Sequence, residues 1–82
     1  MNILTIRGDY GSHHDIEVEQ SRHIVALRVG GTLRGLKQFD CVRKAEKEIE
    51  TVRSMVKEVS MQSTDAKSYY STVSKLLKSR YK

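Results

Sequence analysis

The chain has 82 residues, of which 38% are hydrophobic and 30% are charged, and its 15 lysines and arginines against 10 acidic residues give a net charge of +5. This length allows one small domain with a thin hydrophobic core, which leaves little room for a deep enzyme pocket. The hydrophobic residues are too many and too regularly placed for a disordered chain.

The glycines and the charge divide the chain into two halves. Residues 1–40 are electrically neutral and contain all five glycines, whereas residues 41–82 carry the whole excess of positive charge. Short apolar runs separated by turn-forming residues indicate strands, and a long stretch without glycine or proline favours helix. We therefore expect a single domain over residues 1–82, β-rich over residues 1–39 and helical over residues 40–82.

The first two strands are predicted at Asn2–Arg7 and Asp15–Gln20. In the second of these, apolar and acidic residues alternate, which is typical of a strand with one solvated face. The cluster Gly8-Asp9-Tyr10-Gly11-Ser12 between them has the composition of a turn.

The third strand is predicted at His23–Val29, and its nearly continuous apolar run favours a central position in the sheet. Gly30 and Gly31 then suit a two-residue hairpin turn. The next segment, Thr32–Phe39, repeats apolar residues every third position, so it is either a fourth strand or a helical turn.

An amphipathic helix is predicted from about residue 40 to about residue 60. Apolar residues recur there at alternating spacings of three and four, which places them on one helical face. The members of this face are Val42, Ala45, Ile49, Val52, Val56 and Val59. Asp40 is expected to cap the helix, because its carboxylate can accept a hydrogen bond from a free amide of the first turn.

A second apolar face follows, formed by Ala66, Tyr69, Tyr70, Val73, Leu76, Leu77 and Tyr81. Between the two faces lie Ser60-Met61-Gln62-Ser63-Thr64, which are poor helix formers with cap candidates at Ser63 and Thr64. We favour a break at residues 60–64. The heptad phase continues across them, however, so one helix over residues 40–81, paired with a second chain as a coiled-coil homodimer, is the alternative.

These elements predict an α+β fold in which a small N-terminal antiparallel sheet of three strands, or four, packs against two C-terminal helices or one long helix. The sequence leaves the register of the first strand open between Ile3 and Leu4. The other expected core residues are Ile16, Val18, Ile24, Leu27, Val42, Ile49, Val52, Val56, Tyr70, Val73 and Leu77.

Groups for catalysis or metal binding are sparse. Cys41 is the only cysteine, which excludes an intrachain disulfide and favours a reducing compartment, so we expect a cytoplasmic protein in which Cys41 is buried. Adjacent histidines such as His13 and His14 point to opposite faces of an extended chain, so we expect them to be solvated and not to bind a metal.

No acid and base pair converges either. Glu46, Glu48 and Glu50 are distributed around the predicted helix and are expected to form a solvated face. The sequence contains no run of 18 apolar residues, the length that would indicate a membrane-spanning helix. The sequence therefore predicts a protein that is not an enzyme, requires no cofactor or metal, and does not cross a membrane.

A surface rich in basic residues remains as the candidate binding site. Basic side chains can neutralise phosphates and tyrosines can stack on bases, although lysines also accumulate at helix C-termini for electrostatic reasons alone. The candidate residues are Arg43, Lys44, Lys47, Arg53, Lys57, Lys67, Lys75, Lys78, Arg80 and Lys82.

The main functional hypothesis is a small binding or regulatory protein that docks on a macromolecular partner, more readily a protein than a nucleic acid. In size and β-then-α layout the chain is similar to many small accessory proteins of phages and mobile elements, and this likeness implies inhibition or adaptation of a host protein. The alternative is a nucleic-acid-binding protein that uses the basic helical face. Self-association through the helical faces is expected because the core is small.

Overall fold

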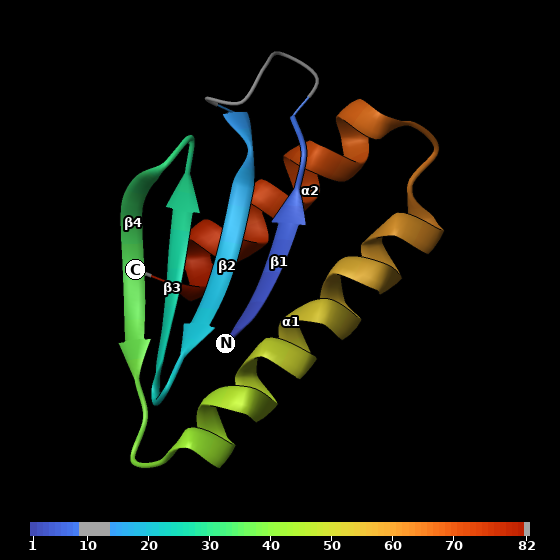
Figure 1. Cartoon of the computed structure of the whole chain (residues 1–82). Helices are drawn as coiled ribbons and strands as arrows, with labels where there is room; N and C mark the ends of the chain where they lie inside the picture. The colour runs from blue at the N-terminus through green and yellow to red at the C-terminus, as the bar shows by residue number, and fades with distance from the viewer. Residues whose placement is uncertain (9–13, 82) are drawn as a thin grey trace.

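The structure, a computed structural model, describes residues 1–8 and 14–81 and has an α+β fold (Figure 1). The elements are β1 (Asn2–Ile6), β2 (Ile16–Ser21), β3 (Ile24–Val29), β4 (Thr32–Gln38), α1 (Val42–Gln62) and α2 (Ala66–Arg80). The strands form one antiparallel sheet in the order β1-β2-β3-β4. The predicted fold class is confirmed, and Thr32–Phe39 contributes a fourth strand instead of a helical turn.

Local chemistry accounts for the strand connections. Gly30 and Gly31 adopt φ angles of 59° and 82°, and they form the predicted two-residue hairpin between β3 and β4. The amide of Gly8 donates to the carboxylate of Asp15 at 3.0 Å, which ties the end of β1 to the start of β2. The predicted turn at Gly8–Ser12 otherwise falls on residues 9–12, which lie outside the described part of the chain.

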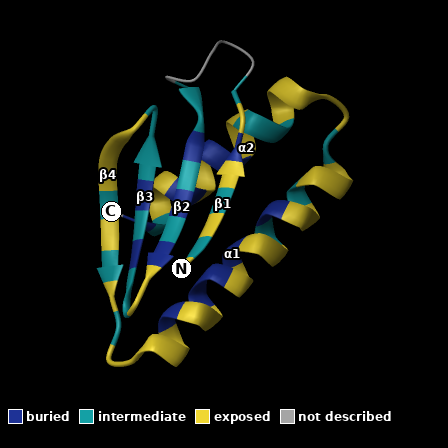
Figure 2. Cartoon of the chain, in the orientation of Figure 1, coloured by how far each residue is buried: buried dark blue, intermediate teal, exposed yellow. Residues whose placement is uncertain are grey.

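Both helices lie on the same side of the sheet, and the hydrophobic core lies between the two layers (Figures 1 and 2). The core residues are Ile6, Ile16, Val18, Val25, Leu27, Ala45, Ile49, Val52, Val56, Val73, Leu77 and Tyr81. Most of the apolar faces of α1 and α2 are therefore buried within one chain, although Val42, Ala66 and Leu76 are exposed. The alternative of a single long helix is wrong.

Three details of the predicted core depend on which side of the sheet a residue faces. Leu4 lies on the covered side and packs against the core, whereas Ile3 points to the other side and is exposed. Ile24 was expected in the core together with Leu27, but residues three apart on a strand face opposite sides, so Val25 takes that place and Ile24 is only half-buried. Tyr70 is also half-buried and packs against the edge of the core.

Val42 was expected in the core as well, and this prediction is wrong. It is the first residue of α1, which begins below the end of the sheet (Figure 1), so no strand covers its side chain and it is exposed. The helical periodicity identified the correct face of α1, but only the arrangement of the layers determines how far along that face the burial extends.

The predicted break between the helices exists, but it lies at residues 63–65 and not 60–64, because residues 60–62 belong to α1. The capping residues also differ from those expected. Cys41, not Asp40, occupies the N-cap of α1, and it makes no capping hydrogen bond and is exposed. Asp65, not Ser63 or Thr64, caps α2, where its carboxylate accepts from the amide of Ser68 at 2.7 Å. Ser63 instead ends α1, and its hydroxyl donates to the carbonyl of Val59.

Candidate functional site

The basic residues predicted on α1 are exposed but do not form a surface of one sign. Arg43, Lys47 and Lys57 alternate with exposed acidic residues, Glu46 and Glu50 among them. An open groove between β1 and α1 shows the same mixture, because its lining includes both carboxylates as well as Arg43 and Lys47. Opposite charges at helical spacings of three and four partly neutralise one another, so this surface attracts a polyanion only weakly.

The two other predicted basic residues of α1 interact within the chain. The Nζ of Lys44 lies 3.0 Å from the carboxylate of Asp40, and the hydrogen bond to this carboxylate raises the pKa of Lys44. The guanidinium of Arg53 donates to the backbone carbonyl of Ile3 at 3.3 Å. Because β1 is an edge strand, this contact occupies one of its backbone acceptors.

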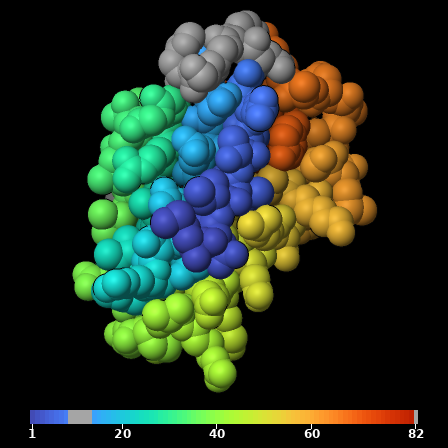
Figure 3. Space-filling model, in the orientation of Figure 1, coloured from blue at the N-terminus to red at the C-terminus, as the bar shows by residue number. Residues whose placement is uncertain are grey.

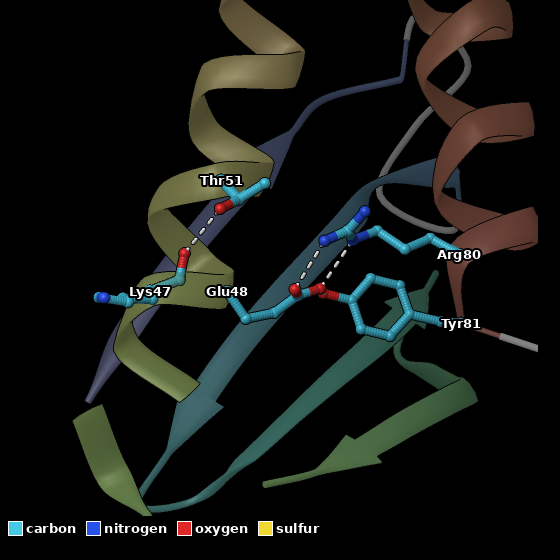
Figure 4. A network of polar contacts seen from close by, with 5 residues as sticks. All are labelled: Lys47, Glu48, Thr51, Arg80 and Tyr81. Atoms are coloured by element: carbon cyan, nitrogen blue, oxygen red, sulfur yellow. Dashed lines mark hydrogen bonds and ion pairs between the residues drawn. The ribbon is translucent and has the colours of Figure 1, made fainter. Parts of the chain in front are cut away.

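Arg80 belongs to a polar network that links the two helices (Figure 4). Its Nε and one terminal nitrogen donate to the two carboxylate oxygens of Glu48 at 2.8 and 2.7 Å. The hydroxyl of Tyr81 donates to the same carboxylate at 2.7 Å. Arg80 was a candidate for binding a partner, but its guanidinium is already engaged, and its evident role is to hold the end of α2 against α1.

Glu48 was expected on a solvated face, and this expectation is wrong, because Glu48 is buried beside Ala45 and Ile49. The hydrogen bonds from Arg80 lower the pKa of Glu48; burial opposes this effect, and the bond from Tyr81 adds to it. The sequence contained a signal for this burial, because positions 45, 48 and 52 share one face of a helix and the residues at 45 and 52 are apolar.

The tyrosines of the C-terminal half are used for packing. Tyr81 is buried, and burial followed by its bond to Glu48 raises its pKa. The hydroxyl of Tyr70 donates to the backbone carbonyl of His14. Tyr69 is half-buried, which raises its pKa. The tyrosines therefore pack as their place on the apolar face predicts, and the base stacking that the nucleic-acid alternative invoked has little exposed ring surface on α2.

The remaining predicted basic residues, Lys67, Lys75 and Lys78, are exposed on α2. The sequence from Ala66 to Arg80 contains no acidic residue. Lys82 lies outside the described residues. The surface of α1 is therefore mixed in charge, whereas α2 carries only basic charges, as the sequence of residues 67–82 indicates.

A second surface, which the sequence analysis did not identify, is the side of the sheet that no helix covers (Figure 3). Ile3, Leu33 and Leu36 lie on it and keep 46%, 47% and 49% of their surface exposed. Ala26 lies between Ile3 and Leu36, because it pairs with Leu36 on β4 and with Glu19 on β2, which in turn pairs with Ile3 on β1. The signal in the sequence was the apolar residues at the solvent-facing positions of three strands.

Charged groups interrupt this surface. Glu19 pairs with Ile3 on β1 and with Ala26 on β3, so it lies between Ile3 and the leucines of β4, and Glu17 pairs with Arg28 on β3. A shallow hollow of about 500 Å³ lies over β3, lined by Glu19, Arg28 and apolar residues including Leu33 and Leu36. We call this uncovered side of β1 to β4 the outer sheet face.

The side chains available for chemistry are dispersed. His23 contacts the amide of Gln38 on the opposite strand, and Cys41 is exposed at the start of α1. Among residues 1–8 and 14–81, no group of three or more histidine, cysteine, aspartate or glutamate side chains is placed to hold a metal ion. His13 lies outside these ranges. Neither α1 nor α2 is long and apolar enough to cross a membrane.

Comparisons with protein-family models, with curated proteins and with solved structures found no match to this chain.

Proposed function

We propose that this chain is a small non-enzymatic binding protein that regulates a protein partner by docking on it through the outer sheet face. The observation that carries this proposal is the half-exposed apolar surface of Leu33 and Leu36, with Ala26 beside Leu36 and Ile3 farther along the same row, on the side of the sheet opposite to the helices. A cluster of large apolar side chains on the outside of so small a protein is typical of an interaction site.

The charges on this face define the partner's chemistry. Within the described part of the chain, Glu17 and Glu19 form no ion pair. Glu19 lies between Ile3 and Ala26, and Glu17 lies between Thr5 and Arg28. A complementary protein presents apolar side chains to Leu33 and Leu36 and a lysine or arginine to the two carboxylates. Arg22 and Arg28 lie on the same face, so its charge is mixed and suits complementary ion pairs with a protein better than a polyanion.

Binding through the outer sheet face would regulate the partner by covering part of its surface. The face is carried by four hydrogen-bonded strands supported from behind by a packed core, so it can bind as a preformed surface with little ordering cost. A bound molecule of this size blocks access to the region of the partner that it covers. It either inhibits that partner or changes what else the partner can bind.

The test compares capture by the native protein with capture by Leu36→Glu and by a control, Met61→Glu. Met61 is 78% exposed at the end of α1, so the control adds the same charge at an exposed apolar position outside the sheet. Immobilised proteins are incubated with extract of the source cells after nuclease treatment, and retained proteins are identified by mass spectrometry. Circular dichroism confirms that each variant is folded.

We expect one protein to be retained by the native chain and by Met61→Glu but lost with Leu36→Glu. With the purified partner, Leu36→Glu should weaken binding at least tenfold, which corresponds to about 1.4 kcal/mol. Reversal of Glu17 and Glu19 to lysine should also weaken binding. Equal retention by all variants would contradict the proposal, and a dimer in solution that Leu36→Glu dissociates would identify a second copy as the occupant.

A further inference from the structure

The exposed side of α2 carries a continuous row of lysines and serines. Lys67, Ser71, Lys75 and Lys78 follow one another at spacings of four, four and three residues, which aligns them along one helical face, and all four are exposed. At a rise of about 1.5 Å per residue, the three lysines extend over roughly 16 Å of the helix axis. We call this row the lysine face of α2.

Within α2, no acidic residue neutralises the lysine face. Asp65 precedes the helix, where its carboxylate accepts from the amide of Ser68. None of the three lysines forms an ion pair with another residue that the structure describes. This distinguishes them from Arg80, which is bound to Glu48, and from the basic residues of α1, which have glutamates beside them.

The row is also free of large apolar side chains, and this indicates the class of ligand. Protein interfaces are built around a desolvated apolar centre. Between Lys67 and Lys78 this face offers only amines and hydroxyls, which are the groups that contact nucleic-acid phosphates. The nearby tyrosines are packed inward, so bases have no aromatic surface on which to stack.

We infer that the lysine face of α2 binds the phosphate backbone of double-stranded nucleic acid without reading its sequence. This inference does not rest on the docking function proposed above. The buried residues of α2 are Val73, Ser74 and Leu77, which do not belong to the lysine row, and α2 lies on the side of the sheet opposite to the outer sheet face (Figure 1). Occupation of one leaves the other open.

The number of lysines sets the expected salt dependence. If each of the three contacts one phosphate, the logarithm of the association constant should fall with the logarithm of salt concentration at a slope of about −2.7 for duplex DNA. Three contacts give weak binding, with a dissociation constant on the order of 100 µM to 1 µM at low salt. Different duplex sequences should bind with similar affinity.

The experiment measures fluorescence anisotropy of a labelled duplex of about 20 base pairs in about 50 mM salt, with the full chain and two triple variants. The first variant is Lys67→Glu, Lys75→Glu and Lys78→Glu. The matched control reverses Arg43, Lys47 and Lys57 of α1 to glutamate, so both variants have the same net charge. A Leu36→Glu variant separates this inference from the docking function.

We expect the α2 variant to lose at least 90% of the affinity, the α1 variant to weaken binding less than threefold, and Leu36→Glu to leave it unchanged. Equal losses in the two triple variants would overturn the inference, because they would show an effect of net charge alone. So would an absence of binding to duplex by the native chain. Binding to polyglutamate but not to duplex would identify an acidic protein as the ligand and would likewise overturn it.

Discussion

The network around Glu48 provides the sharpest test of how the two helices are held together. In Glu48→Ala, the guanidinium of Arg80 and the hydroxyl of Tyr81 both lose their acceptor. The Arg80 side chain keeps 29% of its surface exposed, so water replaces much of what it loses, at a cost of about 1 kcal/mol or less. The Tyr81 hydroxyl is buried, and leaving it unpaired costs about 1–3 kcal/mol.

The expected loss in the free energy of unfolding is therefore about 1–4 kcal/mol for Glu48→Ala, measured by urea denaturation followed by circular dichroism. Glu50→Ala is the matched control, since Glu50 lies on the same helix but is exposed, and its effect should stay within about 0.5 kcal/mol. The double variant Glu48→Ala/Arg80→Ala should lose less than the two single variants together, because each single variant already breaks the same contact.

A loss below about 1 kcal/mol for Glu48→Ala, or a loss equal to that of Glu50→Ala, would refute the reasoning. It would mean that the contacts in Figure 4 do not stabilise the packing of α2 against α1. Additive effects of Glu48→Ala and Arg80→Ala would refute the coupling in particular.

Two further predictions concern the same region. Folding lowers the pKa of Glu48 from 4.5, so the stability that its carboxylate contributes is present above pH 4.5 and is lost as the pH falls through the lower folded pKa. Folding raises the pKa of Tyr81 from 10.0, so the stability that its hydroxyl contributes is complete below pH 10.0 and is lost as the pH rises further. The urea midpoint should therefore fall both at acidic pH and above pH 10.0. If Glu48→Gln loses as much stability at acidic pH as the native chain does, Glu48 is not the group responsible. In Gly35→Ala, the new Cβ would lie 1.8 Å from the carbonyl oxygen of Tyr81, so β4 or the chain end must move. We expect a loss of about 1–3 kcal/mol by urea denaturation, and a change below about 0.5 kcal/mol would show that this contact is dispensable.

Much of the fold followed from patterns within single segments. The alternation in β2, the glycine pair before β4 and the periodicity of α1 are local signals, and each predicted its element to within a few residues. The capping residues were harder to predict, because Asp40 and Cys41 are adjacent and a shift of one position decides which of them begins the helix.

The candidate surfaces were predicted less completely. All ten basic residues could be found in the sequence, and the pair of Lys44 with Asp40 is a local contact four residues apart. The pair of Arg80 with Glu48, at a separation of 32 positions, depends on the fold. The outer sheet face was not predicted, because a sequence shows that a strand has two sides but not which side the helices will cover.

The sequence by itself determined the order of the elements, the break between the helices and the gathering of positive charge in the second half, since all of these depend on neighbouring residues. The tertiary structure alone decided that Glu48 is buried, that Ile3, Leu33 and Leu36 share one exposed surface, and that three lysines of α2 have no acidic partner among the described residues. The physical reason is that burial and charge pairing depend on which layers meet, and residues far apart in the chain determine that arrangement together.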